Sequence, residues 1–269
     1  GGGQAGALED WARARLDPDP HGGGPHGDSY RVSSIYFDTA TFDVLARQGS
    51  YGRSKYRIRR YDHSNTVYLE RKTRGQMRVY KRRSSTGLPT LPRLQGRQAA
   101  RDWDGHWFHR RLIARALTAV SRVDYQRIAR IGYSDYGPMR LTLDQELCAW
   151  PVRAPSFEAS GAGVPLLRQQ LILELKFGHT MPAVFKQLVQ EFAPRVQGIS
   201  KYRLACAALG LSMHALAPAE LPAASLSAAG IGTAAGAGVA AGTAVAAGAA
   251  VGVGAGAAAL RAVSEKLDA

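Results

Sequence analysis

The middle of the chain is dominated by an alternation of hydrophobic and polar positions with a period of two, the period of a β-strand. Seven segments follow it and are predicted to be strands: Tyr30–Phe37, Lys55–Tyr61, Thr66–Lys72, Met77–Arg83, Val123–Ile131, Arg140–Leu147 and Gln170–Phe177. Short polar turns join several consecutive strands, which indicates antiparallel pairing. We therefore expect an α+β protein in which an antiparallel β-barrel is covered by helices.

Helical segments lie between and after these strands. In the core they are predicted at Thr41–Arg47, Trp103–Val120, Pro182–Phe192 and Ser200–Leu209. Proline suits the first turn of a helix, and serine is a favoured N-cap residue. We therefore expect Pro182 and Ser200 to mark the starts of two helices. A further short helix is expected around Leu8–Leu16.

Composition divides the chain into three parts. Residues 1–29 are an N-terminal segment, expected to be truncated or processed because it begins with Gly1 and not with methionine. Residues 30–211 form the structured domain. Residues 212–269 form a tail of Ala and Gly with no charged residue between Glu220 and Arg261. We expect a mobile low-complexity tail, and membrane association through its GxxxG-like spacings is the alternative.

Charge and cysteine content narrow the choice of partner and compartment. The net charge is +14 at pH 7. This surplus favours an anionic partner: nucleic acid, an acidic membrane surface or a phosphorylated small molecule.

The two cysteines, Cys148 and Cys206, lack the spacing of metal ligands, and the first residues lack the pattern of a signal peptide. We therefore expect a reducing, cytoplasmic location.

The charged residues of the predicted strands share a phase. Lys55, Arg57 and Arg59 are two residues apart and face the same side, and between Tyr51 and Arg83 there are twelve Lys or Arg but two acids. In an ordinary small barrel the apolar face fills the interior and the charged face meets water. The alternative is a polar interior that binds an anion, for which Arg and Lys suit phosphate oxygens. Recurrence of the pattern on several strands makes this alternative credible.

Two acids are embedded in this cationic pattern. Glu70 and Glu174 each stand two residues before a lysine, Lys72 and Lys176 respectively. Each carboxylate can form a salt bridge with its cationic neighbours. Each can also coordinate Mg²⁺ or Mn²⁺, hard ions that prefer oxygen ligands and bridge to phosphates. The sequence leaves both roles open.

Short motifs along the domain follow a characteristic order. They are Ser33–Thr39, Lys55–Arg59, Tyr68–Thr73, Tyr125–Arg127, Arg140–Asp144, Leu173–Lys176 and Ser200–Tyr202. Over Tyr30–Gly210 the chain resembles the VTC domain, the polyphosphate polymerase module of the triphosphate tunnel metalloenzyme (CYTH-like) superfamily. The resemblance implies a tunnel-shaped antiparallel barrel that binds ATP and a divalent metal, Mn²⁺ or Mg²⁺. It also implies transfer of the γ-phosphoryl group to a growing polyphosphate chain.

The resemblance assigns roles to individual residues. The phosphate-binding residues would be Arg57, Arg59, Lys72, Lys81, Arg127, Arg140 and Lys201. Of these, the catalytic set would be Arg57, Arg59, Lys72 and Lys201, and Glu174 would bind the metal. The family usually begins with a strand carrying a Glu-x-Lys-Phe-like segment, which has no counterpart before Tyr30. Gly198 stands where the family often has a basic residue.

ATP and inorganic polyphosphate are the expected partners, and other functions remain as alternatives. A metal-dependent triphosphatase of the same superfamily would use the same interior but tends to carry several metal-binding carboxylates. A nucleic-acid-binding protein, which we do not expect, would place aromatic residues beside the cations on one face. Tyr56 lies on the opposite side of the strand from Arg57, whereas Tyr61 lies on the same side. Strand phase therefore does not decide between a nucleic-acid-binding face and a phosphate-binding interior. A phosphate-chain sensor without activity is the third alternative.

Overall fold

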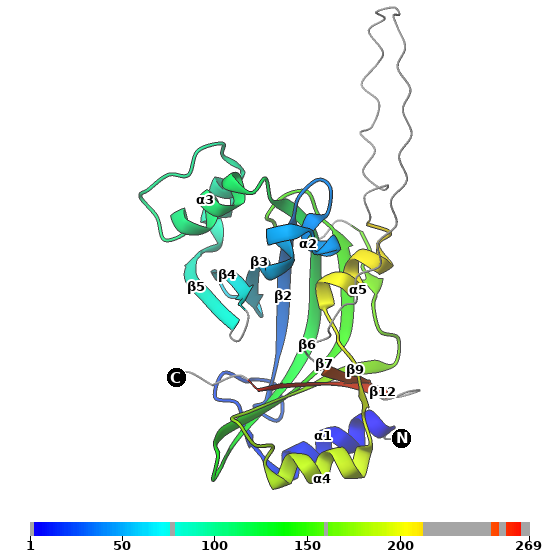
Figure 1. Ribbon diagram of the computed structural model, residues 1–269. Coiled ribbons are helices and arrows are strands. Elements are labelled where there is room, and N and C mark those ends of the chain that lie inside the picture. The colour runs from blue at the N-terminus through cyan, green and yellow to red at the C-terminus, as the bar shows by residue number, and fades with distance from the viewer. Residues whose placement is uncertain (1–2, 76–78, 159–160, 212–248, 253–256, 265–269) are drawn as a thin grey trace, which may run out of the picture.

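The main feature of the computed structural model is one large sheet (Figure 1). The structure describes residues 3–75, 79–158, 161–211, 249–252 and 257–264. Strand order across the sheet is β10-β11-β12-β9-β7-β6-β2-β3-β4-β5. The long strands are β2 (Ser29–Asp38), β3 (Ser54–Tyr61), β4 (Thr66–Arg74), β5 (Val79–Gly87), β6 (Thr118–Ser134), β7 (Gly137–Pro151) and β9 (Gln170–Phe177). From β9 to β5 in this order, each strand pairs antiparallel with its neighbours.

Five further strands complete the sheet: β1 (Asp17–Pro18), β8 (Val164–Pro165), β10 (Arg195–Val196), β11 (Ala249–Gly252) and β12 (Ala257–Ser264). The backbone of β12 pairs in parallel with β9, which places part of the C-terminal segment beside the domain. The strand path ends at β5 and β10, and the described residues contain no pairing between these two strands. Most of the expected tail, residues 212–248, 253–256 and 265–269, lies outside the described residues.

The helices form separate groups around the sheet. They are α1 (Gln4–Arg15), α2 (Asp43–Ala46), α3 (His106–Ala114), α4 (Ala183–Phe192) and α5 (Lys201–Ala208), with 3₁₀ turns η1 (Gly49–Arg53) and η2 (Leu88–Gln95). In Figure 1, α1 and α4 lie together at one end of the molecule, whereas α2 and α5 lie near the other. No helix in the described ranges is long and apolar enough to cross a membrane.

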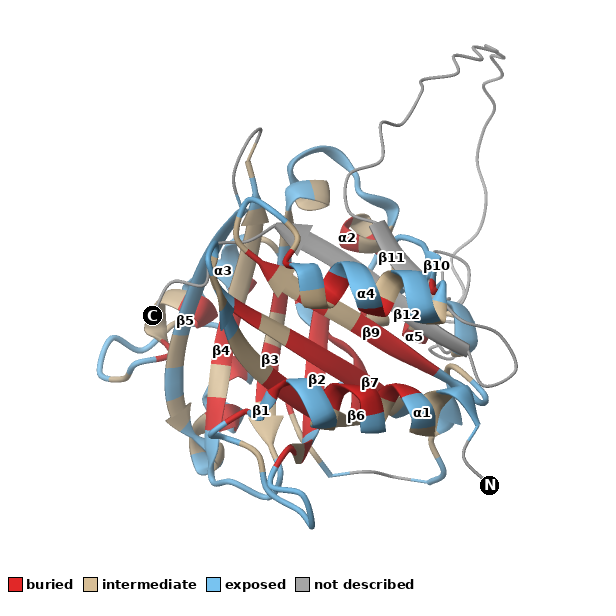
Figure 2. Cartoon of the chain, turned by 90° about the horizontal axis from the view of Figure 1, so that it is seen from below, coloured by how far each residue is buried: buried red, intermediate tan, exposed pale blue. Residues whose placement is uncertain are grey.

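One hydrophobic core lies between β7, β9 and the helix pair α1 and α4. Leu143 and Leu173 face each other in register on the two strands, and both are fully buried. Phe185 of α4 and Leu8 of α1 pack against them. Figure 2 shows the buried stretches of β7 and β9 behind these two helices. Each such buried side chain contributes about 1.5–3 kcal/mol to stability.

A second core joins β2, β3 and β4 to α3 and η2. Phe108 of α3 is fully buried, with its ring 5.6 Å from that of Phe37 and 6.0 Å from that of Tyr56. Ile58 and Leu69, opposite each other on β3 and β4, belong to the same cluster. The apolar positions predicted from the strand alternation therefore point toward helices, which leaves the charged positions on the other side of the sheet.

The expected fold class is confirmed: the structure is α+β, with an antiparallel sheet and helices packed on it. The expected strand segments correspond to β2–β7 and β9, and the first two residues of the expected segment Met77–Arg83 lie outside the described residues. The helix predicted over Trp103–Val120 is wrong in its second half, because α3 ends at Ala114 and β6 begins at Thr118. Ala116 has a left-handed backbone (φ 48°), which breaks the helix between them. Ser200 occupies the N-cap position of α5 as expected, without a side-chain capping bond.

Candidate functional site

Cations and carboxylates face each other on one side of the sheet. Arg57 of β3 lies opposite Glu70 of β4, and Glu70 lies opposite Arg83 of β5. Tyr56 and Ile58, the residues next to Arg57, are buried on the other side because successive side chains of a strand alternate. We call the side that carries Arg57 and Glu70 the charged face.

Glu70 is the centre of the first cluster on this face. Its carboxylate accepts a hydrogen bond from Arg57 Nε at 2.6 Å and lies 3.1 Å from Lys81 Nζ and 3.5 Å from Arg83 Nε. Its side chain is 3% exposed. Burial alone would raise the pKa of Glu70, but Arg57, Arg59 and Lys81 outweigh burial and hold the pKa well below its usual range. Glu70 is therefore ionised at neutral pH.

Asp144 of β7 is the centre of the second cluster and is completely buried. Arg127 of β6 lies in register with it and donates two hydrogen bonds, Nε to Oδ1 at 2.6 Å and Nη2 to Oδ2 at 2.8 Å. Lys201 of α5 donates a third, Nζ to Oδ2, at 2.6 Å. Burial opposes ionisation of Asp144, but Arg127 and Lys201 outweigh it and lower its pKa far below the usual value. The carboxylate thus aligns two cations from different elements.

Arg59 and Tyr125 link the two clusters. Arg59 is 7% exposed and donates to Tyr125 Oη from Nη2 at 3.2 Å and to Ser34 Oγ from Nε at 3.2 Å. Lys201 Nζ lies 4.6 Å from the centre of the Tyr125 ring, within range of a cation–π interaction. The charged face is therefore one connected network from Glu70 to Asp144.

Helix α5 is held in place by a buried tyrosine next to Lys201. Tyr202 Oη donates to Asp38 Oδ2, and its ring stacks on that of Tyr36 with 5.4 Å between centroids. Asp38 also accepts the backbone N–H groups of Val44 and Leu45 at the start of α2. Burial raises the pKa of Tyr202 far above its usual value, so the phenol keeps its donor proton. Tyr202 thus fixes the helix that presents Lys201.

The other predicted phosphate-binding residues lie at the margins of this network. Lys72 of β4 is in register with Lys55 on one side and Lys81 on the other, so three lysines lie in a row across β3, β4 and β5. Lys81 also pairs with Glu70 and Lys55 donates to Ser200, so the row places three ammonium groups beside residues of the network. Arg140 of β7 donates to Tyr30 Oη at 2.9 Å and lies 2.7 Å from Asp19 Oδ2.

Glu174 of β9 lies beyond Asp144, in register with Thr142 of β7. Its Oε1 is 3.7 Å from Lys176 Nζ, and its side chain is 13% exposed. Thr142 Oγ1 is buried and has no hydrogen-bond partner among the described residues. The described residues contain no group of three or more His, Cys, Asp or Glu side chains that could hold a metal ion. One carboxylate beside a hydroxyl fits Mg²⁺ or Mn²⁺ where waters and substrate phosphates supply the other ligands.

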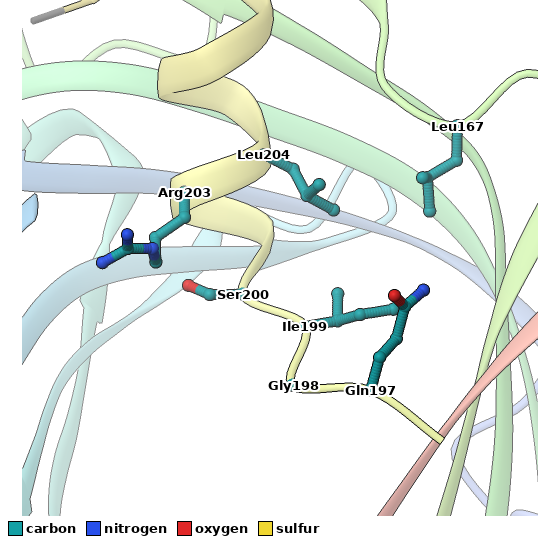
Figure 3. Close-up of a pocket in the computed structure, with 7 residues that line it drawn as sticks. All are labelled: Leu167, Gln197, Gly198, Ile199, Ser200, Arg203 and Leu204. Carbon is teal, nitrogen blue, oxygen red and sulfur yellow. The ribbon is translucent and has the colours of Figure 1, made fainter. Parts of the chain in front are cut away.

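A pocket of about 250 Å³ opens beside the start of α5 (Figure 3). It is lined by residues 197–200 and by Leu167, Arg203 and Leu204. Ser200 is the link to the charged face, because its Oγ accepts a hydrogen bond from Lys55 Nζ at 3.0 Å. None of the predicted phosphate-binding residues lines this pocket, so it is a neighbour of the charged network and not its centre.

The structure brings together part of the predicted set and adds residues to it. Of the predicted phosphate-binding residues, Arg57 and Lys81 contact Glu70, and Arg127 and Lys201 contact Asp144. Sequence reasoning did not propose Asp144, Arg83 or Tyr125 as site residues. Asp144 could have been found, because it shares a strand phase with Arg140, whereas the contact between Tyr125 and Lys201 depends on how α5 packs.

The network carries a large positive surplus. Six cationic side chains (Arg57, Arg59, Lys81, Arg83, Arg127 and Lys201) surround two carboxylates, Glu70 and Asp144. Arginine offers paired donors to phosphate oxygens, and lysine offers a compact charge. Chemically, the face suits a chain of several phosphate groups better than a single anion.

Solved structures provide weak likenesses. A candidate adenylate cyclase from Bacillus halodurans is 17% identical, with a TM-score of 0.39, and covers 63% of this chain and 78% of its own. A candidate adenylyl cyclase from Hippeastrum, for which a dominant triphosphatase activity is described, is 15% identical, with a TM-score of 0.34, and covers 54% of this chain and 69% of its own. No curated protein sequence matches the chain.

A family model gives the decisive match. The model of the VTC domain matches residues 4–210, which is more than three quarters of the 269-residue chain. The match includes every strand and helix that builds the charged face, from β2 to α5. It starts before Tyr30 and so also includes α1. This chain belongs to the VTC domain family.

Proposed function

We propose that this chain is a polyphosphate polymerase, which transfers the γ-phosphoryl group of ATP to a growing polyphosphate chain. The observation that carries the proposal is the surplus of cations in the Glu70 and Asp144 clusters. Two carboxylates cannot neutralise six cations, and a linear polyanion can. Membership of the VTC domain family supports an enzyme that acts on phosphate chains.

Phosphoryl transfer depends mainly on alignment and on neutralisation of charge, with little covalent help from the protein. Arg57 and Arg59 would hold consecutive phosphate groups from β3. Arg127 and Lys201 would neutralise charge that develops on the transferred group, because Asp144 fixes both side chains in place. The row formed by Lys55, Lys72 and Lys81 would bind the continuing phosphate chain.

A divalent ion would bind at Glu174 in this proposal. Mn²⁺ or Mg²⁺ would supply further neutralisation of the phosphate oxygens when bound. Thr142, opposite Glu174, offers a hydroxyl oxygen toward the same side of the sheet. An ion bound at Glu174 would lie beside Lys176, whose Nζ is 3.7 Å from Glu174 Oε1.

Incubation of the purified chain with ATP and Mn²⁺, followed by gel detection of polyphosphate, tests the proposal. We expect a ladder of chains that depends on metal and disappears in Arg57→Ala. Arg93→Ala is the matched control, because Arg93 lies in η2 and pairs with the exposed Asp102, away from the charged face. Release of inorganic phosphate from ATP without polyphosphate would establish a triphosphatase instead. Normal synthesis by Arg57→Ala would contradict the assigned site.

A further inference from the structure

Three tyrosines form a continuous row on the charged face, next to the arginines. Tyr30 of β2 contacts Tyr61 of β3 with ring centroids 5.7 Å apart and planes at 70°. Tyr61 contacts Tyr68 of β4 at 5.6 Å and 69°. Tyr61 follows Arg59 by two residues, and Tyr68 lies opposite Arg59 in register. We call Tyr30, Tyr61 and Tyr68 the tyrosine arc.

Arginines flank the tyrosine arc at both ends. The Arg83 guanidinium carbon lies 3.6 Å from the centre of the Tyr68 ring and 5.7 Å from that of Tyr61. Arg140 donates to Tyr30 Oη at the other end. Edge-to-face contacts hold the rings in fixed orientations, and a guanidinium close above a ring adds a second flat surface.

Tyr30 is buried in the core, at 5% exposure, whereas Tyr61 and Tyr68 are more exposed than a core tyrosine. Tyr56, on the opposite face of β3, is 3% exposed and packs against Phe108. Tyr61 and Tyr68 are half-buried, and the Arg83 side chain is 35% exposed. Tyr61, Tyr68 and Arg83 are therefore partly exposed, and the Arg83 guanidinium lies over the Tyr68 ring.

We propose that Tyr61, Tyr68 and Arg83 form a nucleobase subsite, in which the base of a nucleoside triphosphate stacks beside the phosphate-binding arginines. The inference rests on the proposed function, because it places the base of the ATP that the enzyme consumes. Aromatic rings and arginine planes are the usual stacking partners of unpaired bases. Stacking is tolerant of base identity, so GTP should bind nearly as well as ATP.

The subsite gives the bound substrate a direction. Along β3 the positions on the charged face are Lys55, Arg57, Arg59 and Tyr61, in that order, at a spacing of about 7 Å for each two residues. With the base at Tyr61, the phosphates run past Arg59 and Arg57 toward Lys55. The γ-phosphate then lies nearest the lysine row, and the polyphosphate chain extends from that end.

The test compares binding of a non-hydrolysable ATP analogue with binding of tripolyphosphate, each with and without Mn²⁺, by calorimetry. In Tyr68→Ala we expect the ATP analogue to bind roughly ten-fold more weakly, the effect of one lost stacking partner. Tripolyphosphate should bind within two-fold of its affinity for the parent. Tyr68→Phe, which keeps the ring, should restore binding. Tyr133→Ala is the control, because Tyr133 is 81% exposed at the β6–β7 turn.

Other outcomes overturn the subsite in distinguishable ways. Binding of the ATP analogue to Tyr68→Ala as tightly as to the parent would remove the base subsite and leave the proposed function intact. An equal loss of both ligands in Tyr68→Ala would mean that the arc only supports the sheet. Binding of neither ligand by the parent would remove the proposed function as well. A single-stranded oligonucleotide that binds more tightly than the ATP analogue and depends on Tyr68 would make the arc a nucleic-acid site.

Discussion

Lys201 and Asp144 join α5 to the sheet, with Lys201 Nζ 2.6 Å from Asp144 Oδ2. Asp144 is completely buried, and the Lys201 side chain is 12% exposed. The carboxylate also holds Arg127, so one residue sets the position of two cations that come from distant parts of the sequence. A buried charge is tolerated when it is paired in this way, and removal of its partner is costly.

Asp144→Asn should therefore destabilise the protein by about 3–5 kcal/mol, because Arg127 and Lys201 would be left without their buried partner. Urea unfolding at low salt is the measurement. Tripolyphosphate should recover part of the loss, because it supplies the missing negative charge. Asp102→Asn is the control, since the pair formed by Asp102 and Arg93 is exposed and should be worth less than about 1 kcal/mol.

The low pKa of Glu70 predicts that the folded protein loses stability at acid pH. The pKa of Glu70 in the folded protein lies far below the unfolded value of about 4.3, so the ionised carboxylate stabilises the fold above that pH. The stabilisation is lost as the pH falls below the unfolded value. The free energy of unfolding, measured from pH 6 to pH 2, should fall with a shallower slope in Glu70→Gln than in the parent. Equal slopes would mean that Glu70 carries no net interaction with Arg57 or Lys81.

Tripolyphosphate should stabilise the folded protein by filling the charged face. A ligand that binds the native state alone adds about 2.7 kcal/mol at a hundred-fold excess over Kd. We expect the melting temperature to rise by several degrees, and less at high salt because salt screens the cations. Arg57→Ala combined with Arg59→Ala should remove most of the shift. Equal stabilisation by single-stranded DNA at the same phosphate concentration would indicate a surface that binds any polyanion.

Glu174→Gln tests the metal site, because it removes a charge without a change in size. We expect loss of metal-dependent turnover and unchanged unfolding, with Glu158→Gln, an exposed carboxylate, as the control. Turnover equal to that of the parent at limiting Mn²⁺ would mean that Glu174 is not a metal ligand.

The sequence predicted the strands well, and for a physical reason. Strands such as β3 and β4 bury one side, so burial enforces the alternation that can be read from residues such as Tyr56 and Ile58, whereas β5 has no buried residue. The prediction of a helix over Trp103–Val120 was wrong at its C-terminal end. The helix is broken by the left-handed backbone of Ala116, and an alanine in the sequence does not indicate such a conformation. Local pattern therefore gave the elements but not every boundary.

The site was predictable only in part. Strand phase places Arg57, Arg59 and Glu70 on one face, and the register then follows from the hairpin between β3 and β4. Contacts between distant elements, such as Lys201 with Asp144, depend on the packing of α5. The tyrosine arc needs the order of β2, β3 and β4 in the sheet, which alternation alone does not provide.

Tyr202 offers a test of how α5 presents Lys201 without any change to a cation. Tyr202→Phe keeps the ring that stacks on Tyr36 and removes the hydrogen bond to Asp38. Because the acceptor is a buried carboxylate, the loss should cost about 1–3 kcal/mol of stability. Asp38 keeps the N–H groups of Val44 and Leu45, so the start of α2 should remain formed.

The same variant should affect function through the position of Lys201. If α5 becomes less ordered, Lys201 leaves Asp144 part of the time, and KM for ATP should rise more than kcat falls at a temperature where the variant is fully folded. Lys201→Met should show the larger defect, and addition of Tyr202→Phe to it should add little, because both changes act through one cation. Additive losses in the double variant would show that Tyr202 supports the fold independently of Lys201.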